Sequence, residues 1–273
     1  MTLAGAARVA RAYPTLLRVG FAEAVAYRAE MLVWMLATTM PLVSLALWSA
    51  VAAEAPVGRF TQARFGAYFL ATLVVRQLTG SWLVWEMNQE IRGGALSGRL
   101  LKPIHPLLAY SAENLSALPL RAALSVPVAL LALFAVDRGA LAPGTMTAPR
   151  LAIFAFSLLG AWLINFLTMA IIGSLAFFVE SSTAIFELWL VAFMLLSGYL
   201  LPLELFPPWL RAVTAVLPFR YTVAFPVETL IGLLGVGEAL RELAVQWAFV
   251  AASAAGARFA WRAGIKRFGA FGG

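Results

Sequence analysis

Residues 151–179 read LAIFAFSLLGAWLINFLTMAIIGSLAFFV, and none of these 29 consecutive side chains is charged. An α-helix rises about 1.5 Å per residue, so about 20 predominantly apolar residues cross the ~30 Å hydrocarbon core of a bilayer. The stretch is therefore long enough to span a membrane with a tilt or with one end protruding. It predicts an integral membrane protein.

The composition of the whole chain agrees with that prediction. Apolar residues make up 62% of the 273 residues and charged residues only 12%, whereas a soluble globular chain carries about 25% charged residues. Such a chain has too little polar surface to cover a water-facing domain, which excludes a cytosolic enzyme and a disordered scaffold. The absence of cysteine excludes thiolate sites, and the single histidine, His105, excludes sites built from several histidines.

Further apolar runs predict an all-α fold of six transmembrane helices that form one domain over residues 1–273. The expected spans are about 30–53, 66–86, 115–136, 151–179, 184–203 and 239–260. With both termini on the cytoplasmic side, the inner segments hold more Lys and Arg residues than the outer ones, as the positive-inside rule requires. These cations form no basic stripe, so no nucleic-acid partner is expected.

Two segments outside the spans have patterns of their own. Tyr13, Leu17, Phe21 and Ala24 recur at helical spacing, which predicts an amphipathic helix at the inner membrane surface; the alternative is the polar start of a long first helix. After the fifth span, residues 204–234 are apolar but interrupted by four prolines. Such broken backbone is tolerated only against protein or a water-lined cavity, so we expect short re-entrant helices on the outer side.

The inner loop 87–106 lies within the stretch 86–106, EMNQEIRGGALSGRLLKPIHP. Its glycines break helices and its prolines stop them. The short turn between these breaks exposes leucines beside Arg and Lys residues, and leucines kept among charges at a membrane surface indicate a docking contact. The alternative is a loop that packs only on its own helix ends.

Two charged residues lie inside the expected spans: Arg76 near the middle of the second and Glu187 at the beginning of the fifth. A charge in the bilayer centre costs roughly 2.5–3.5 kcal/mol on insertion scales. We therefore predict two alternatives for Arg76. Either it lines a substrate pathway or gate together with Glu187, or it packs against Glu113, Glu187 or another acidic residue.

The sequence contains no motif for catalysis. There is no GxxxxGK[ST] phosphate loop, no GxSxG and no HExxH. Glu86 and Glu90 share a helix face, but their position beside Arg92 predicts a solvated or partner-facing helix end rather than an acid–base pair. We expect no catalytic residue, no metal and no cofactor bound by this chain.

Three segments resemble the permeases of ABC-2-type transporters. EIRGGALSGRLLKPIHPLLAY, residues 90–110, resembles their loop between the second and third spans. SGYLLPLELFPPWLRAVTAVLPFRYTVAFPVETLIG, residues 197–232, is similar to the region after their fifth span. RFAWRAGIKRFGAFGG, residues 258–273, resembles their basic C-terminal tail. The three occur in the family's order and the likeness covers nearly the whole chain, although Gly98 and Arg99 stand where an acidic or aromatic residue is common.

The resemblance implies a permease of an ATP-driven exporter in a bacterial inner membrane, with both termini cytoplasmic. It would form the pathway as a dimer with an identical or homologous permease among membrane lipids, and the first, second and fifth spans would line the dimer interface. Two copies of a separate cytoplasmic ATPase would bind the ATP. The loop 87–106 would be the ATPase-coupling element, with the contacts Glu90, Arg92, Leu96, Leu100, Leu101 and Lys102.

Two other functions remain open from the residues alone. The chain could be a non-transporting membrane scaffold or assembly subunit whose loop binds a partner. It could also be an ion-coupled secondary transporter, although its few intramembrane acids argue against that function. The substrate is open as well, because the family's substrates range from drugs and lipids to polysaccharides and peptides.

Overall fold

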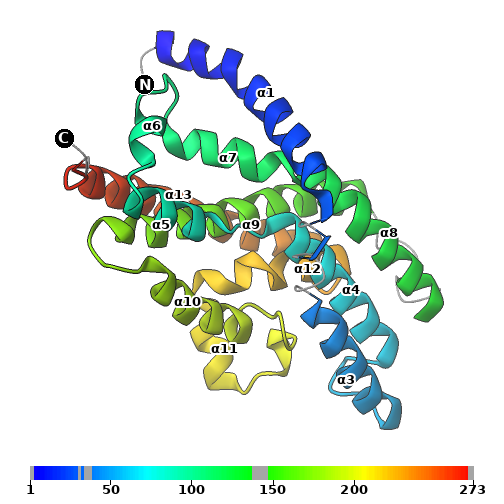
Figure 1. The fold of residues 1–273 in the computed structure, drawn as a ribbon. Helices are drawn as coiled ribbons and strands as arrows, with labels where there is room; N and C mark the ends of the chain where they lie inside the picture. The colour runs from blue at the N-terminus through cyan, green and yellow to red at the C-terminus, as the bar shows by residue number, and fades with distance from the viewer. Residues whose placement is uncertain (1–2, 30–31, 34–38, 137–146, 270–273) are drawn as a thin grey trace.

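The computed structural model describes residues 3–29, 32–33, 39–136 and 147–269. In this part of the chain the fold is helical (Figure 1), apart from one isolated β-bridge between Val57 and Phe60. The predicted all-α class is therefore confirmed for the described residues.

Three helical stretches in the described ranges are long and apolar enough to cross a membrane: Pro106–Ala132, Ala148–Phe177 and Val236–Ile265. The first comprises α7 (Pro106–Ser116) and most of α8 (Leu118–Val136). The second is α9 (Ala148–Ser174), which the 3-10 helix η1 (Leu175–Phe177) continues. The third is α13 (Val236–Ile265). They coincide with the expected spans 115–136, 151–179 and 239–260.

The pairing of α9 with α13 forms the centre of the bundle. Gly160 on α9 lets the two helices approach, because a Cβ atom there would lie 2.7 Å from the Gln246 carboxamide. Gln246 Nε2 in turn donates hydrogen bonds of 2.8 Å to the backbone oxygens of Ser157 and Tyr221. The Gln246 side chain thus links α13 to α9 and to the backbone at Tyr221.

The expected second span, 66–86, coincides with two helices rather than one. α4 (Gln62–Thr79) ends before Gly80, and α5 (Leu83–Arg92) begins three residues later. Arg121 Nη1 donates a hydrogen bond of 3.2 Å to the Gly80 oxygen, which satisfies one carbonyl at the break. Most of α4 is buried in the bundle, and α5 packs on α9 and η1.

The other two expected spans coincide with shorter helices. α3 (Met40–Glu54) and α10 (Ser182–Leu196) each contain 15 residues, fewer than the ~20 needed for a full crossing. Part of the expected first span, residues 30–31 and 34–38, lies outside the described residues. The count of six spans stays a prediction.

The proline-rich segment after α10 folds back into the bundle. It contains η2 (Leu203–Leu205), α11 (Pro208–Ala215), η3 (Pro218–Thr222) and α12 (Ala224–Leu230). Gly198 has a φ of +85° and lies so close to Tyr68 that a Cβ atom would be 2.5 Å from its hydroxyl. Tyr68 donates a 2.7 Å hydrogen bond to the Gly198 oxygen. The broken backbone is thereby held against protein.

The N-terminal helix α1 (Leu3–Ala26) lies along α7 (Figure 1). Tyr13 and Ser111 share a hydroxyl hydrogen bond of 2.9 Å, and the buried Gly20 faces Ser116. Arg18 is exposed, as the amphipathic pattern predicts, but Phe21 from the expected apolar side is exposed too. The position of α1 at a membrane surface stays a prediction.

Candidate coupling site

The loop between α5 and α7 contains one short helix, α6 (Leu96–Leu100). Gly94 forms the turn that leads from α5 into α6. Its φ of +77° is a backbone conformation that residues other than glycine rarely adopt. Leu96 is fully buried in a core cluster that also contains Met87 from α5 and Tyr110 from α7. The loop is therefore packed onto both flanking helices through one leucine.

Arg99 joins α6 to the same two helices through charge. Its Nε donates hydrogen bonds of 2.8 and 2.7 Å to the two carboxylate oxygens of Glu90. Its Nη2 donates to Glu86 at 2.6 Å and its Nη1 to Glu113 at 2.7 Å. The guanidinium carbon lies 4.2 Å from the centre of the Tyr110 ring, and the Tyr110 hydroxyl donates to Glu90 at 2.6 Å. We call these five residues the Arg99 cluster.

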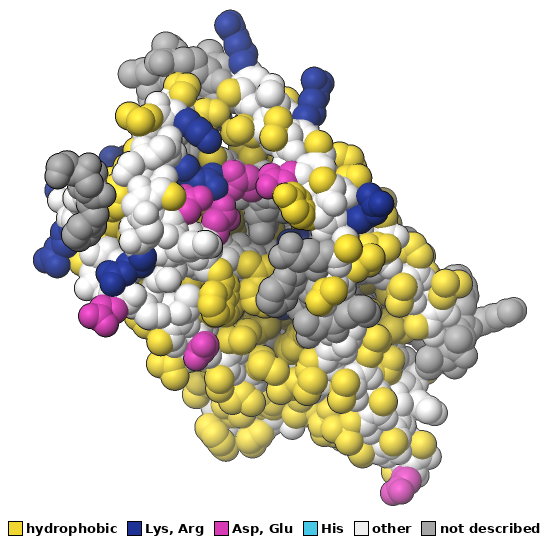
Figure 2. Space-filling model, in the orientation of Figure 1, with side chains coloured by type: hydrophobic (Ala, Val, Ile, Leu, Met, Phe, Trp, Pro, Cys, Tyr) yellow, Lys and Arg dark blue, Asp and Glu magenta, His cyan; other side chains and the backbone are white. Residues whose placement is uncertain are grey.

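The cluster is acidic overall, because three carboxylates surround one guanidinium. Burial opposes the charge of Arg99, but its hydrogen bond and charge interaction with Glu113, and its contacts with Glu90 and Glu86, outweigh burial and raise the pKa of Arg99. Arg99 is only 16% exposed, whereas Glu86 and Glu113 are 41% and 37% exposed. A group of acidic side chains beside basic ones is visible on this end of the molecule in Figure 2.

The six expected contact residues of the loop divide into two groups. Leu96 is buried and Glu90 belongs to the Arg99 cluster, so both make their contacts within the chain. The other four are exposed, and Leu101 is 89% exposed; they are Arg92, Leu100, Leu101 and Lys102. The exposed part of the loop therefore offers two leucines beside cations.

His105 has a local structural role at the end of this loop. Its Nδ1 accepts a hydrogen bond of 3.2 Å from the backbone nitrogen of Leu107 and so caps α7. Its ring lies 5.5 Å from that of Trp261 on α13. Burial lowers the pKa of His105, and the nearby charge of Arg258 lowers it further.

The structure does not pair Arg76 with an acidic residue of the described chain. Its guanidinium carbon lies 5.1 Å from the centre of the Phe193 ring, a cation–π contact between α4 and α10. Glu113, one of the predicted partners, binds Arg99 instead. Glu187 is exposed on α10 and forms no ion pair with Arg76.

A sequence profile described as "ABC-2 family transporter protein" matches residues 25–272. The match includes the whole loop, both flanking helices and the C-terminal tail. The chain belongs to the ABC-2 transporter family. This confirms the resemblance seen in the sequence. A comparison with curated proteins gave no match.

Family membership makes this ABC-2 chain the membrane permease of an ABC transporter, a multi-pass protein that associates with an ABC ATPase. A permease of this family is the transport component and is not itself catalytic. No cluster of His, Cys, Asp or Glu side chains in the described part of the permease has the arrangement of a metal site.

Sequence reasoning missed Arg99 as the central residue of the permease's loop. Glu86 and Glu90 were expected to form a solvated or partner-facing helix end, yet Glu90 is only 19% exposed and bonds to Arg99. The four-residue spacing of the two glutamates was the available signal, because it places them on one face of α5. The third carboxylate, Glu113, comes from another helix.

Proposed function

We propose that this ABC-2 permease forms the substrate pathway of an ATP-driven exporter together with a second, identical or homologous permease. In this proposal two cytoplasmic ATPase subunits bind the ATP and dock onto the loop 87–106. The permease lies in a bacterial inner membrane with both termini in the cytoplasm. The observation that carries the proposal is the Arg99 cluster together with the exposed Leu100 and Leu101 in the same loop.

The Arg99 cluster supports a coupling role because it ties the loop to two helices at once. Glu86 and Glu90 belong to α5, which packs on α9 and η1, whereas Glu113 belongs to α7, which leads into α8. A force on α6 therefore reaches both helices through short, charge-assisted hydrogen bonds. Such bonds are about twice as strong as neutral ones, so the loop moves with the helices rather than independently of them.

The exposed side chains of the loop support the docking role. Leu101 and Leu100 lie next to each other, 89% and 39% exposed, and Lys102 follows. Apolar anchors next to a cation are suited to a protein partner with an apolar pocket and an acidic rim. In the proposal Arg92, Leu100, Leu101 and Lys102 touch the ATPase directly, whereas Leu96 and Glu90 hold the loop in place.

Two apolar helix faces support the dimer. α10 exposes Leu188, Val191 and Leu195, and α3 exposes Val43 and Leu47. Both faces follow helical spacing and are available to lipid or to a second permease. The proposal places the second permease against these faces, which belong to the first and fifth expected spans, whereas α4 from the second span is mostly buried within the chain.

Arg76 and Glu187 are the proposed pathway residues. Arg76 contacts the Phe193 ring and forms no ion pair with a carboxylate of the described residues. An anionic group of a substrate could therefore pair with its guanidinium without breaking an ion pair. In the proposal Arg76 is a gate residue for amphiphiles that carry a negative charge.

The test is ATP hydrolysis by an ABC ATPase that co-purifies with this permease in mild detergent, measured after reconstitution in liposomes. We expect hydrolysis to depend on the permease, and the double variant Leu100→Asp/Leu101→Asp to lose ATPase binding while it still inserts and folds. Arg241→Gln, at an exposed position near the N-terminal end of α13, serves as a surface control away from the loop. Unchanged ATPase binding by the double variant would remove the coupling assignment.

A further inference from the structure

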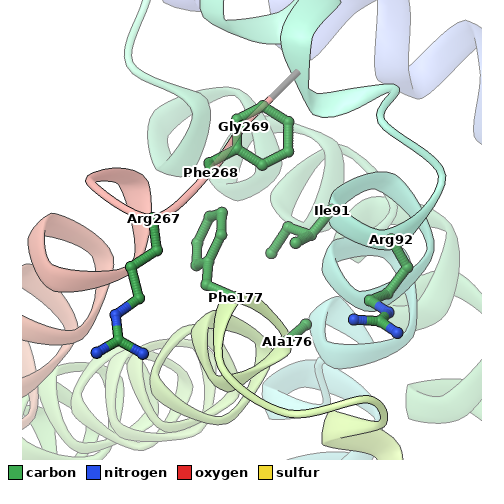
Figure 3. A pocket seen from close by; sticks show the side chains of 7 residues that line it. All are labelled: Ile91, Arg92, Ala176, Phe177, Arg267, Phe268 and Gly269. Atoms are coloured by element: carbon green, nitrogen blue, oxygen red, sulfur yellow. The ribbon is translucent and has the colours of Figure 1, made fainter. Parts of the chain in front are cut away.

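A pocket of about 300 Å³ lies where three chain segments meet at the loop end of the bundle. α5 contributes Ile91 and Arg92, and η1 contributes Ala176 and Phe177. The residues after α13 contribute Arg267 and Phe268 (Figure 3). We call it the tail pocket. Its volume lies at the lower limit of small-molecule sites, which is about 300 Å³.

The floor of the tail pocket is aromatic and fixed. The Phe177 ring packs edge-on against Phe268 and against Trp261, with centroid distances of 5.9 and 5.8 Å. Gly264 on α13 provides the room for Phe177, because a Cβ atom at that position would overlap the ring. The apolar part of the pocket is therefore built by packing between α13 and η1.

The charge of the tail pocket is entirely positive. Its lining contains two arginines and no carboxylate. Arg92 is exposed and forms no ion pair within the described residues. The Arg267 guanidinium lies 5.0 Å from the centre of the Phe178 ring. In Figure 3 the two arginine side chains flank Phe177 and Ala176 and extend in the same general direction.

The surroundings of the tail pocket add to this charge. The last turns of α13 and the residue that follows carry three exposed cations, Arg258, Arg262 and Lys266. In the proposed orientation this end of α13 meets the cytoplasmic leaflet, whose anionic lipids attract basic segments. Basic pockets between helices on this side are suited to lipid headgroups.

We propose that the tail pocket binds the phosphate of an anionic phospholipid from the cytoplasmic leaflet. Arg92 and Arg267, which lie on opposite sides of Phe177 and Ala176 (Figure 3), attract the phosphate by their charge, while Phe177 and Phe268 contact the glycerol and the first acyl carbons. A pocket of about 300 Å³ has room for a headgroup only, so the acyl chains run along the outside of the helices. The bound lipid connects α5, at the base of the docking loop, with the C-terminal end of α13. The inference rests on the proposed function for the orientation of the permease, and it shares Arg92 with the proposed ATPase contact, so its test is made without an ATPase.

The aromatic floor favours a lipid over free phosphate. Inorganic phosphate would use the charge of the guanidinium groups but would leave the partly exposed rings of Phe177 and Phe268 uncovered. A phospholipid covers both kinds of surface at once. Since each cation near an anionic membrane surface contributes about 1 kcal/mol, or roughly a fivefold change in binding, neither arginine alone accounts for the whole affinity.

The test is lipid binding by the purified permease in detergent, measured by native mass spectrometry without any ATPase. Phosphatidylglycerol and phosphatidylcholine with the same acyl chains are titrated in parallel. We expect tighter binding of phosphatidylglycerol, weakened roughly fivefold by Arg267→Gln and again by Arg92→Gln. Arg262→Gln removes the same charge from the last turn of α13 but lies outside the pocket lining, so it serves as the matched control.

Inorganic phosphate is the competitor that separates the two sources of a phosphate group. We expect phosphatidylglycerol to remain bound when inorganic phosphate is present at the same concentration as the lipid. Displacement under that condition would make the pocket a site for free phosphate and would overturn the proposal. Equal binding of both lipids, or an equal loss in Arg262→Gln and Arg267→Gln, would overturn it too. Because no ATPase is present, these outcomes are independent of the coupling proposal.

Discussion

Replacing Arg99 by glutamine removes the only cation from a group of three carboxylates. Breaking a buried ion pair by removal of one partner costs about 3–5 kcal/mol, whereas exposed pairs contribute about 0–1 kcal/mol. Glu90 is 19% exposed, so its ion pair with Arg99 resembles a buried pair. Glu86 and Glu113 are 41% and 37% exposed, so solvent partly screens their ion pairs with Arg99. We expect a loss of about 3 kcal/mol in the free energy of unfolding.

This loss has a measurable consequence for the permease in detergent. A change of 1 kcal/mol shifts the Tm of a chain of about this size by roughly 2–4 °C, so Arg99→Gln should lower it by about 6–12 °C. Tryptophan fluorescence during heating measures the shift, since the chain contains nine tryptophans. The Tm of Arg99→Lys should lie between those of the native permease and Arg99→Gln, because lysine keeps the charge but lacks the guanidinium fork.

The control and a double variant make the Arg99 prediction specific. Arg92→Gln removes the same charge from an exposed position seven residues earlier and should leave the Tm nearly unchanged. In a double-mutant cycle, Glu90→Gln should cost much less in the Arg99→Gln background than in the native permease. Equal Tm values for the Arg92 and Arg99 variants would refute the role assigned to the Arg99 cluster.

Three further predictions concern other positions. Arg76→Ala should reduce transport in liposomes while the permease still folds and assembles; loss of folded protein would instead make Arg76 structural. The pKa of His105 is lowered in the folded state, so the unfolded chain binds more protons and stability falls as pH drops below about 6.5. His105→Asn keeps a capping side chain and should remove this part of the pH dependence of the Tm; an unchanged pH dependence would contradict it. Gly160→Ala should destabilise the permease by about 1–3 kcal/mol through overlap with Gln246, whereas Gly237→Ala, which meets open space, should not; equal thermal shifts would contradict it.

The long apolar helices were predictable because hydropathy alone determines them. α9 and α13 coincide with expected spans, since a long, predominantly apolar run can satisfy its backbone in a membrane only as a helix. The break at residues 80–82 was not predictable in this way. Arg121, which comes from another helix, bonds to the Gly80 oxygen at the break, and hydropathy carries no information about such a contact.

In the candidate site too, features within the loop were predictable from the sequence, whereas contacts between helices were not. The exposed leucines and the glycine turns of the loop are local features, and the sequence indicated them. Arg99 acquires its role only because α7 returns beside α5 and brings Glu113 to the guanidinium. The tail pocket depends still more on tertiary structure, because Arg92, Phe177 and Arg267 come from three distant parts of the chain.

The central claim, that the loop 87–106 contacts an ATPase, is tested most directly by cross-linking. The chain contains no cysteine, so Leu101→Cys provides a single thiol on the loop and Arg241→Cys a single thiol at the other end of α13. Membranes that contain the permease and a co-expressed ABC ATPase are treated with a short thiol-to-amine cross-linker. We expect a permease–ATPase product from Leu101→Cys and none from Arg241→Cys. Absence of that product, or equal amounts from both positions, would contradict the account.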